Sequence, residues 1–150
     1  MLHRLLPPSI DNAHRGSRGA LWILGLLAVA KLGIGLGAIF NGRSTALSAD
    51  GIPLDSFSAD GARTVVALFA LWGLGQLLLG LFCLLVLVRY RAMVPLAFAV
   101  LLLENVGRKA ILWFLPYASV ARGSNLVVNG VLVALMVLGL ALSLRQRDVR

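Results

Sequence analysis

The chain consists of four long apolar runs separated by short polar segments that are rich in arginine. The runs cover about residues 20–40, 64–88, 93–115 and 125–144. Each is close to the roughly 20 residues with which an α-helix crosses about 30 Å of hydrocarbon. The pattern predicts an all-α fold, a bundle of four transmembrane helices. Polar tails at 1–19 and 145–150 and a loop at 41–63 complete the single membrane domain.

The third run is the least uniform, because the stretch LLLENVGRKAILWF at 101–114 places a charged cluster between apolar segments. If this cluster were a loop, the apolar part before it, 93–103, would be too short to cross a membrane. We therefore expect one helix over 93–115. Glu104, Asn105, Arg108 and Lys109 then lie inside the membrane on one broad helix face.

Composition and charge support this assignment and indicate an orientation. The chain is 59% hydrophobic and 13% charged, which is more apolar than a soluble domain of 150 residues could bury. Its net charge of +8 comes mainly from arginines at the ends of the apolar runs, so no nucleic-acid-binding face is expected. Both tails and the turn at 89–91 are basic, whereas the 41–63 loop is net negative. The positive-inside rule then predicts a multi-pass protein of the bacterial inner (cytoplasmic) membrane with both termini in the cytoplasm.

Each predicted helix carries polar residues at a similar depth. Lys31, Gln76 and Glu104 each lie thirteen residues from an arginine at the expected cytoplasmic end of their helix. At about 1.5 Å per residue, this is roughly 20 Å into the bilayer. Polar groups at that depth should point into the bundle. The candidate ligand-binding residues are Lys31, Gln76, Glu104, Asn105, Arg108, Lys109 and Asn129.

The charges of these residues do not balance along the sequence. Glu104 and Arg108 form an i,i+4 pair in the favourable order, which leaves Lys31 and Lys109 without an acidic partner in any span. Either the two lysines become neutral or reach toward water, or an anionic ligand enters the bundle and supplies the missing charge.

Catalytic and metal-binding patterns are absent from the sequence. There is no Cys-x-x-Cys, no paired histidines and no Ser-His-acid set, and Cys83 is the single cysteine. No catalytic residue, metal site or cofactor is predicted, although a quinone or a lipid would suit a buried polar site. Whether the protein is an enzyme stays open, and the sequence favours that it is not.

Two local patterns predict details of helix packing and capping. Gly33 and Gly37 form a small-xxx-small pair, which favours the close approach of another helix. Ser-Ala-Asp-Gly occurs at 48–51 and again at 58–61. We expect turns at both places and an N-cap before the second long helix.

The layout resembles that of small bacterial four-helix membrane proteins of the DoxX-like kind. The shared features are a short basic tail, a long first loop, the basic turn VRYRAMVPL at 88–96 and the charged third helix with LENVGRKAI at 103–111. The resemblance covers about residues 18–145 and implies fold and location. It also suggests quinone-linked or thiol-linked redox complexes, but a lone Cys83 does not fit a dithiol role.

Two hypotheses for function follow. The first is a small binding or accessory protein of the lipid bilayer, whose site holds an acidic or carbonyl-bearing amphiphile such as a lipid headgroup or a quinone. The second is a structural or assembly subunit, whose buried charges pair with a partner membrane protein or with another copy of the chain.

Overall fold

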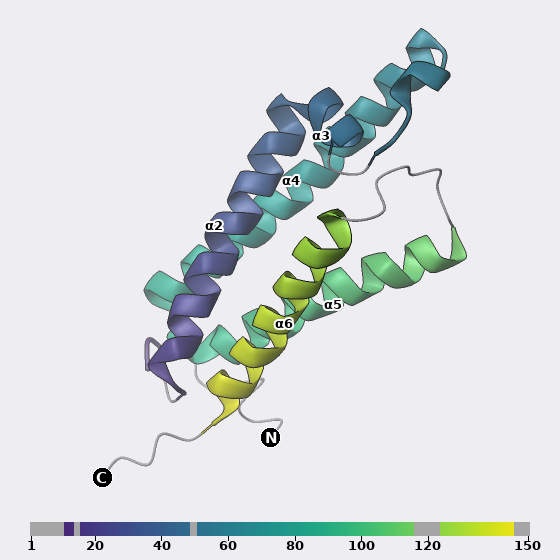
Figure 1. The fold of residues 1–150 in the computed structure, drawn as a ribbon. Coiled ribbons are helices and arrows are strands. Elements are labelled where there is room, and N and C mark those ends of the chain that lie inside the picture. Colours follow the sequence, from purple (N-terminus) through teal and green to yellow (C-terminus); the bar gives the residue numbers. More distant parts are fainter. Residues whose placement is uncertain (1–10, 14–15, 49–50, 116–123, 146–150) are drawn as a thin grey trace.

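The computed structural model describes residues 11–13, 16–48, 51–115 and 124–145, and within these ranges the chain is helical without strands. Figure 1 shows the four long helices, and the all-α prediction is confirmed for this part of the chain. The helices are α2 (Arg18–Phe40), α4 (Ala59–Arg89), α5 (Val94–Phe114) and α6 (Ser124–Leu144).

Three described helices are long and apolar enough to cross a membrane, as is typical of a membrane protein. They are α2, α4 and the Val127–Leu144 part of α6. The 21 residues of α5 would also suffice in length, but this helix carries three charged residues, Glu104, Arg108 and Lys109. Its place in the membrane therefore depends on how those charges are accommodated.

The connection between the first two long helices is partly helical. It contains the short helices α3 (Gly42–Ser48) and η1 (Leu54–Ser56). Ser58 then caps α4, since its hydroxyl accepts the N–H of Gly61 at 3.2 Å, as the sequence pattern predicted. Helix α4 starts at Ala59 rather than near residue 64, because Asp60 and Arg63 form its exposed first turns instead of a loop.

Small residues bring α2 and α4 into close contact. A Cβ at Gly35 would lie 2.7 Å from the backbone nitrogen of Leu77 and 2.8 Å from the carbonyl oxygen of Gly73, so neither helix could approach this closely with larger residues there. Gly33 and Gly37, the small-xxx-small pair, make no such contact within the described chain, where a Cβ at either would meet nothing within 4 Å. The contact is made by the other face of α2, the one that carries Lys31 and Gly35.

The hydrophobic core lies toward the end of the bundle at which α4 turns into α5. All four long helices contribute to it, with Phe98 and Leu24 among its largest fully buried side chains. Phe98 packs against Gly139 of α6, where no larger residue would fit. The next buried residue of α2 after this core is Lys31, so the polar groups begin where the apolar core ends.

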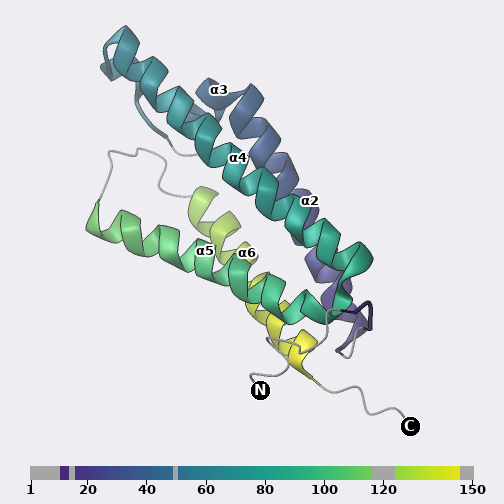
Figure 2. The same cartoon turned by 180° about the vertical axis from the view of Figure 1, so that it is seen from behind.

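Helix α5 leaves the bundle as it extends away from this core. Figures 1 and 2 show that α4 and α5 diverge from the turn that joins them, with α6 alongside α5. Every residue from 109 to 115 is exposed within the described chain. The first half of α5 is therefore packed in the core, whereas its last turns are not covered by any described residue.

Both ends of the described helical region meet at the α4–α5 turn. The backbone N–H of Ser17 donates to the carbonyl of Leu142 at 3.1 Å, and Ala92 in the turn donates to the carbonyl of Asp11 at 3.2 Å. The start of α2, the end of α6 and the α4–α5 turn thus lie at one end of the molecule (Figure 1).

Candidate functional site

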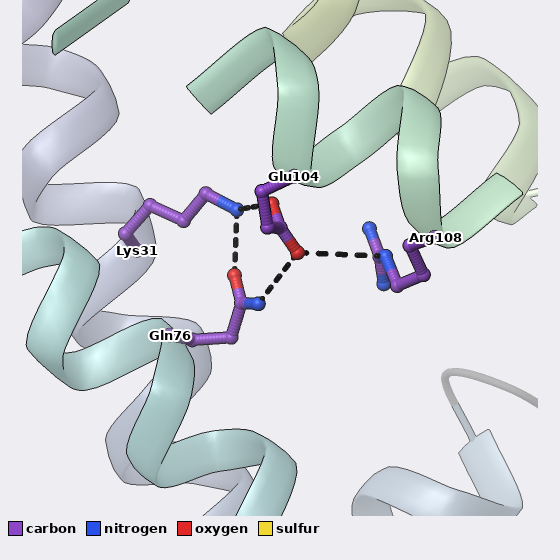
Figure 3. Close-up of polar contacts among 4 residues, drawn as sticks. All are labelled: Lys31, Gln76, Glu104 and Arg108. Carbon is purple, nitrogen blue, oxygen red and sulfur yellow. Dashed lines mark hydrogen bonds and ion pairs between the residues drawn. The ribbon is translucent and has the colours of Figure 1, made fainter. Parts of the chain in front are cut away.

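Three side chains from three helices form a closed ring of hydrogen bonds just beyond the core. Lys31 of α2 donates from Nζ to Gln76 Oε1 at 2.6 Å and to Glu104 Oε2 at 2.7 Å. Gln76 of α4 donates from Nε2 to the other carboxylate oxygen of Glu104, on α5, at 2.9 Å (Figure 3). We call these three residues together with Arg108 the polar cluster.

The ring corrects the expected charge balance. Lys31 was expected to have no acidic partner, yet it forms an ion pair with Glu104, with side chains 4% and 21% exposed. The expectation counted partners along one helix, whereas the two carboxylate oxygens of Glu104 serve different helices. Lys31 therefore needs no ligand to supply its counter-charge.

Arg108 is the second cation near the same carboxylate, and it is less completely satisfied. Its Nε lies 3.7 Å from Glu104 Oε1, which is ion-pair range but too long for a hydrogen bond. The guanidinium carbon lies 5.3 Å from the centre of the Trp72 ring, a cation–π contact between α5 and α4. Its Nε is buried without a hydrogen-bond partner.

Further buried polar atoms also lack partners. They are the indole Nε1 of Trp72 and both amide atoms of Asn105, a residue only 1% exposed. A buried polar group without a hydrogen bond is costly, so these atoms are available to bind a further polar group. Asn105 and Arg108 are one turn apart on α5, and Trp72 faces Arg108 from α4.

The remaining predicted residues lie outside this arrangement. Lys109 is exposed and makes no hydrogen bond or ion pair with the described part of the chain. Asn129 is half-buried on α6 and takes no part in the hydrogen-bonded ring. The structure therefore brings together Lys31, Gln76, Glu104 and Arg108, with Asn105 buried beside them on α5.

Trp72 was not among the site residues predicted from the sequence, although it shares a helix face with Gln76. It lies four residues before Gln76 and therefore one turn further along the same face of α4. Glu104 and Arg108 have the same spacing on the antiparallel α5. Once Gln76 is paired with Glu104, this register places Trp72 opposite Arg108, which is the signal that could have identified it.

The cluster has a surplus of positive charge that suits an anion better than a metal ion. Lys31 and Arg108 share the single carboxylate of Glu104. Within the described residues, no three His, Cys, Asp or Glu side chains gather as a metal site would require. Comparison of the chain with protein-family models, curated proteins and solved structures finds no match.

Proposed function

We propose that this protein is a small accessory protein of the bacterial inner membrane that binds an acidic or carbonyl-bearing amphiphile at the polar cluster. The observation that carries the proposal is Arg108. Its guanidinium competes with Lys31 for one carboxylate, and its buried Nε has no hydrogen-bond partner. Packing alone rarely retains an incompletely paired arginine near the middle of a membrane helix, because ionisable residues there usually mark a ligand or ion path.

The proposal includes α5 as a fourth membrane span. A charged residue at the centre of a membrane helix costs about 2.5–3.5 kcal/mol on insertion scales. The ion pair of Glu104 with Lys31 offsets part of this cost, because it joins opposite charges within the bundle. The 21 residues of α5 are sufficient to cross the hydrocarbon. A four-span chain with cytoplasmic termini also agrees with the meeting of both ends at the basic α4–α5 turn.

A DoxX-like membership fits this proposal without adding residue roles. The shared layout would account for the four helices and the basic turn, and a quinone would be one carbonyl-bearing amphiphile. Cys83 is buried in the core and is the single cysteine, so no dithiol chemistry is proposed.

The experiment is to purify the protein in a mild detergent and identify bound small molecules by mass spectrometry. Wild type should retain about one amphiphile per chain. Arg108→Ala should lose it at matched folded yield, and Lys109→Ala, which removes an exposed charge one residue away, should keep it. If wild type carries only bulk lipid in no fixed ratio, the binding function is refuted.

A structural or assembly role is the second candidate, and the exposed end of α5 favours it. Residues 109–115 have no cover in the described chain, and Trp113 and Phe114 are among the most exposed apolar side chains. A partner helix could pack there. Purification that always yields a second membrane protein in fixed ratio, with no retained amphiphile, would support this role instead.

A further inference from the structure

Some polar atoms in and beside the polar cluster already have hydrogen-bond partners, and others do not. Both carboxylate oxygens of Glu104 and both amide atoms of Gln76 have partners within the ring. The buried side-chain atoms beside the ring that have no partner are Arg108 Nε, Trp72 Nε1 and both amide atoms of Asn105, and three of these four are donors. A ligand at this place therefore meets hydrogen-bond donors and a cation.

The surplus positive charge of the cluster distinguishes between a quinone and an anionic amphiphile as the ligand. A quinone carbonyl could accept one hydrogen bond, but it carries no charge and would leave two cations sharing one carboxylate. A carboxylate or phosphate accepts several hydrogen bonds and also balances the surplus charge. Arginine binds such groups through its planar fork of donors, more strongly than it binds neutral acceptors.

Access favours Arg108 over Lys31 as the ligand-binding cation. The side chain of Arg108 is 31% exposed, whereas that of Lys31 is 4% exposed and closed off by the ring. Beyond Arg108, the end of α5 diverges from α4 (Figure 2). In the described part of the chain, the apolar side chains at this end of α5 are exposed, Ile111 and Trp113 among them. An acyl chain could lie along this surface while its headgroup reaches the guanidinium from the side.

On the basis of the proposed function, we infer that the ligand is an anionic amphiphile. Its carboxylate or phosphate binds Arg108 and the indole N–H of Trp72, and it enters sideways from the membrane between α4 and α5. The ring of Lys31, Gln76 and Glu104 lies beside this site and does not contact the headgroup.

The test is equilibrium binding to the purified full chain, measured by native mass spectrometry in an uncharged detergent. Four probes are titrated separately: oleate, dioleoyl phosphatidic acid, a short-chain ubiquinone and inorganic phosphate. We expect one molecule of an anionic amphiphile to bind per chain, at least about tenfold more tightly than the ubiquinone. Oleate and phosphatidic acid separate a carboxylate from a phosphate headgroup, and inorganic phosphate shows whether an acyl chain is needed.

Three variants make the assignment specific. Arg108→Gln should weaken binding of the anionic amphiphile at least about tenfold, and Arg108→Lys should restore part of it. Trp72→Phe keeps an aromatic ring but lacks the indole N–H, so it should weaken binding by a smaller factor. Lys109→Gln removes an equal charge one residue away and should leave binding within about twofold, because Lys109 is exposed and forms no hydrogen bond or ion pair with the described cluster.

The outcomes separate this inference from the proposed function. If ubiquinone binds at one per chain as tightly as the anionic probes, or if Lys109→Gln weakens binding as much as Arg108→Gln, the anionic site is refuted while amphiphile binding stands. If inorganic phosphate binds as tightly as the lipids, entry from the membrane is refuted. If no probe binds in fixed ratio and wild type retains none on purification, both proposals fail.

Discussion

Replacing Glu104 by glutamine should be the most damaging single change in the polar cluster. Glu104→Gln preserves shape but removes the carboxylate shared by Lys31 and Arg108. The side chain of Lys31 is 4% exposed, so the substitution would leave its amine buried without an acidic partner. Breaking a buried pair typically costs about 3–5 kcal/mol, and because Glu104 is 21% exposed, the expected loss of unfolding free energy is about 3 kcal/mol.

Replacing Lys31 instead should cost less, because Glu104 then keeps its other partners. After Lys31→Met, Glu104 still accepts the hydrogen bond of Gln76 and still has Arg108 at ion-pair distance. The expected loss is about 1–2 kcal/mol, the range for one interhelical polar contact in a membrane protein. The double variant Lys31→Met/Glu104→Gln contains no unpaired buried lysine. It should therefore be more stable than Glu104→Gln alone by about 1–2 kcal/mol.

This double-mutant cycle can be measured as the free energy of unfolding in mixed micelles, by SDS titration followed by circular dichroism. The losses of unfolding free energy should be strongly non-additive, with Lys31→Met partly rescuing Glu104→Gln. Additive losses to within about 0.5 kcal/mol would show that Lys31 and Glu104 do not interact. A larger loss for Lys31→Met than for Glu104→Gln would refute the assigned role of Arg108 as a second partner.

Three further predictions test the surrounding fold. Gly35→Ala should lower thermal stability by about 1–3 kcal/mol, since its Cβ would lie 2.7 Å from the Leu77 nitrogen. Gly33→Ala, on the open side of the same helix, should cost less than about 0.5 kcal/mol, and equal losses would contradict the packing. Ser58→Ala should remove about 1 kcal/mol of capping energy, seen as faster hydrogen exchange at the start of α4, and unchanged exchange would argue against the cap. Cys83 is 0% exposed and should react with a maleimide only after denaturation in SDS, so rapid labelling of the native protein would contradict the core.

The sequence was sufficient to predict which polar residues lie at the same level along their helices. Counting residues from basic helix ends placed Lys31, Gln76 and Glu104 at one level, and the structure joins them by contacts of 2.6–2.9 Å. This succeeds because the rise per residue of an α-helix is fixed. The N-cap at Ser58 was predictable for a similar reason, since a capping side chain acts on backbone groups only a few residues away.

Rotation and tilt of the helices could not be predicted in the same way. Helix α2 is apolar on nearly all sides, so the small-xxx-small pattern alone does not show which glycine contacts α4, and the close contact is at Gly35 rather than at Gly33 or Gly37. The pairing of Lys31 with Glu104 depends on three helices at once. The divergence of α5 from α4 depends on packing that no local pattern encodes, so neither this divergence nor the contact of Arg108 with Trp72 was predicted.

The most direct test is the depth of Trp72, because both proposals require the polar cluster to lie inside the membrane. Trp22 and Trp113 are 83% and 84% exposed, so Trp22→Phe/Trp113→Phe should fold normally and leave Trp72 as the single tryptophan. Its fluorescence is measured in bilayers whose lipids carry bromine at different positions along the acyl chain. The strongest quenching is expected from bromines deep in the hydrocarbon. Strongest quenching near the headgroups, or none at any depth, would contradict a cluster inside the membrane.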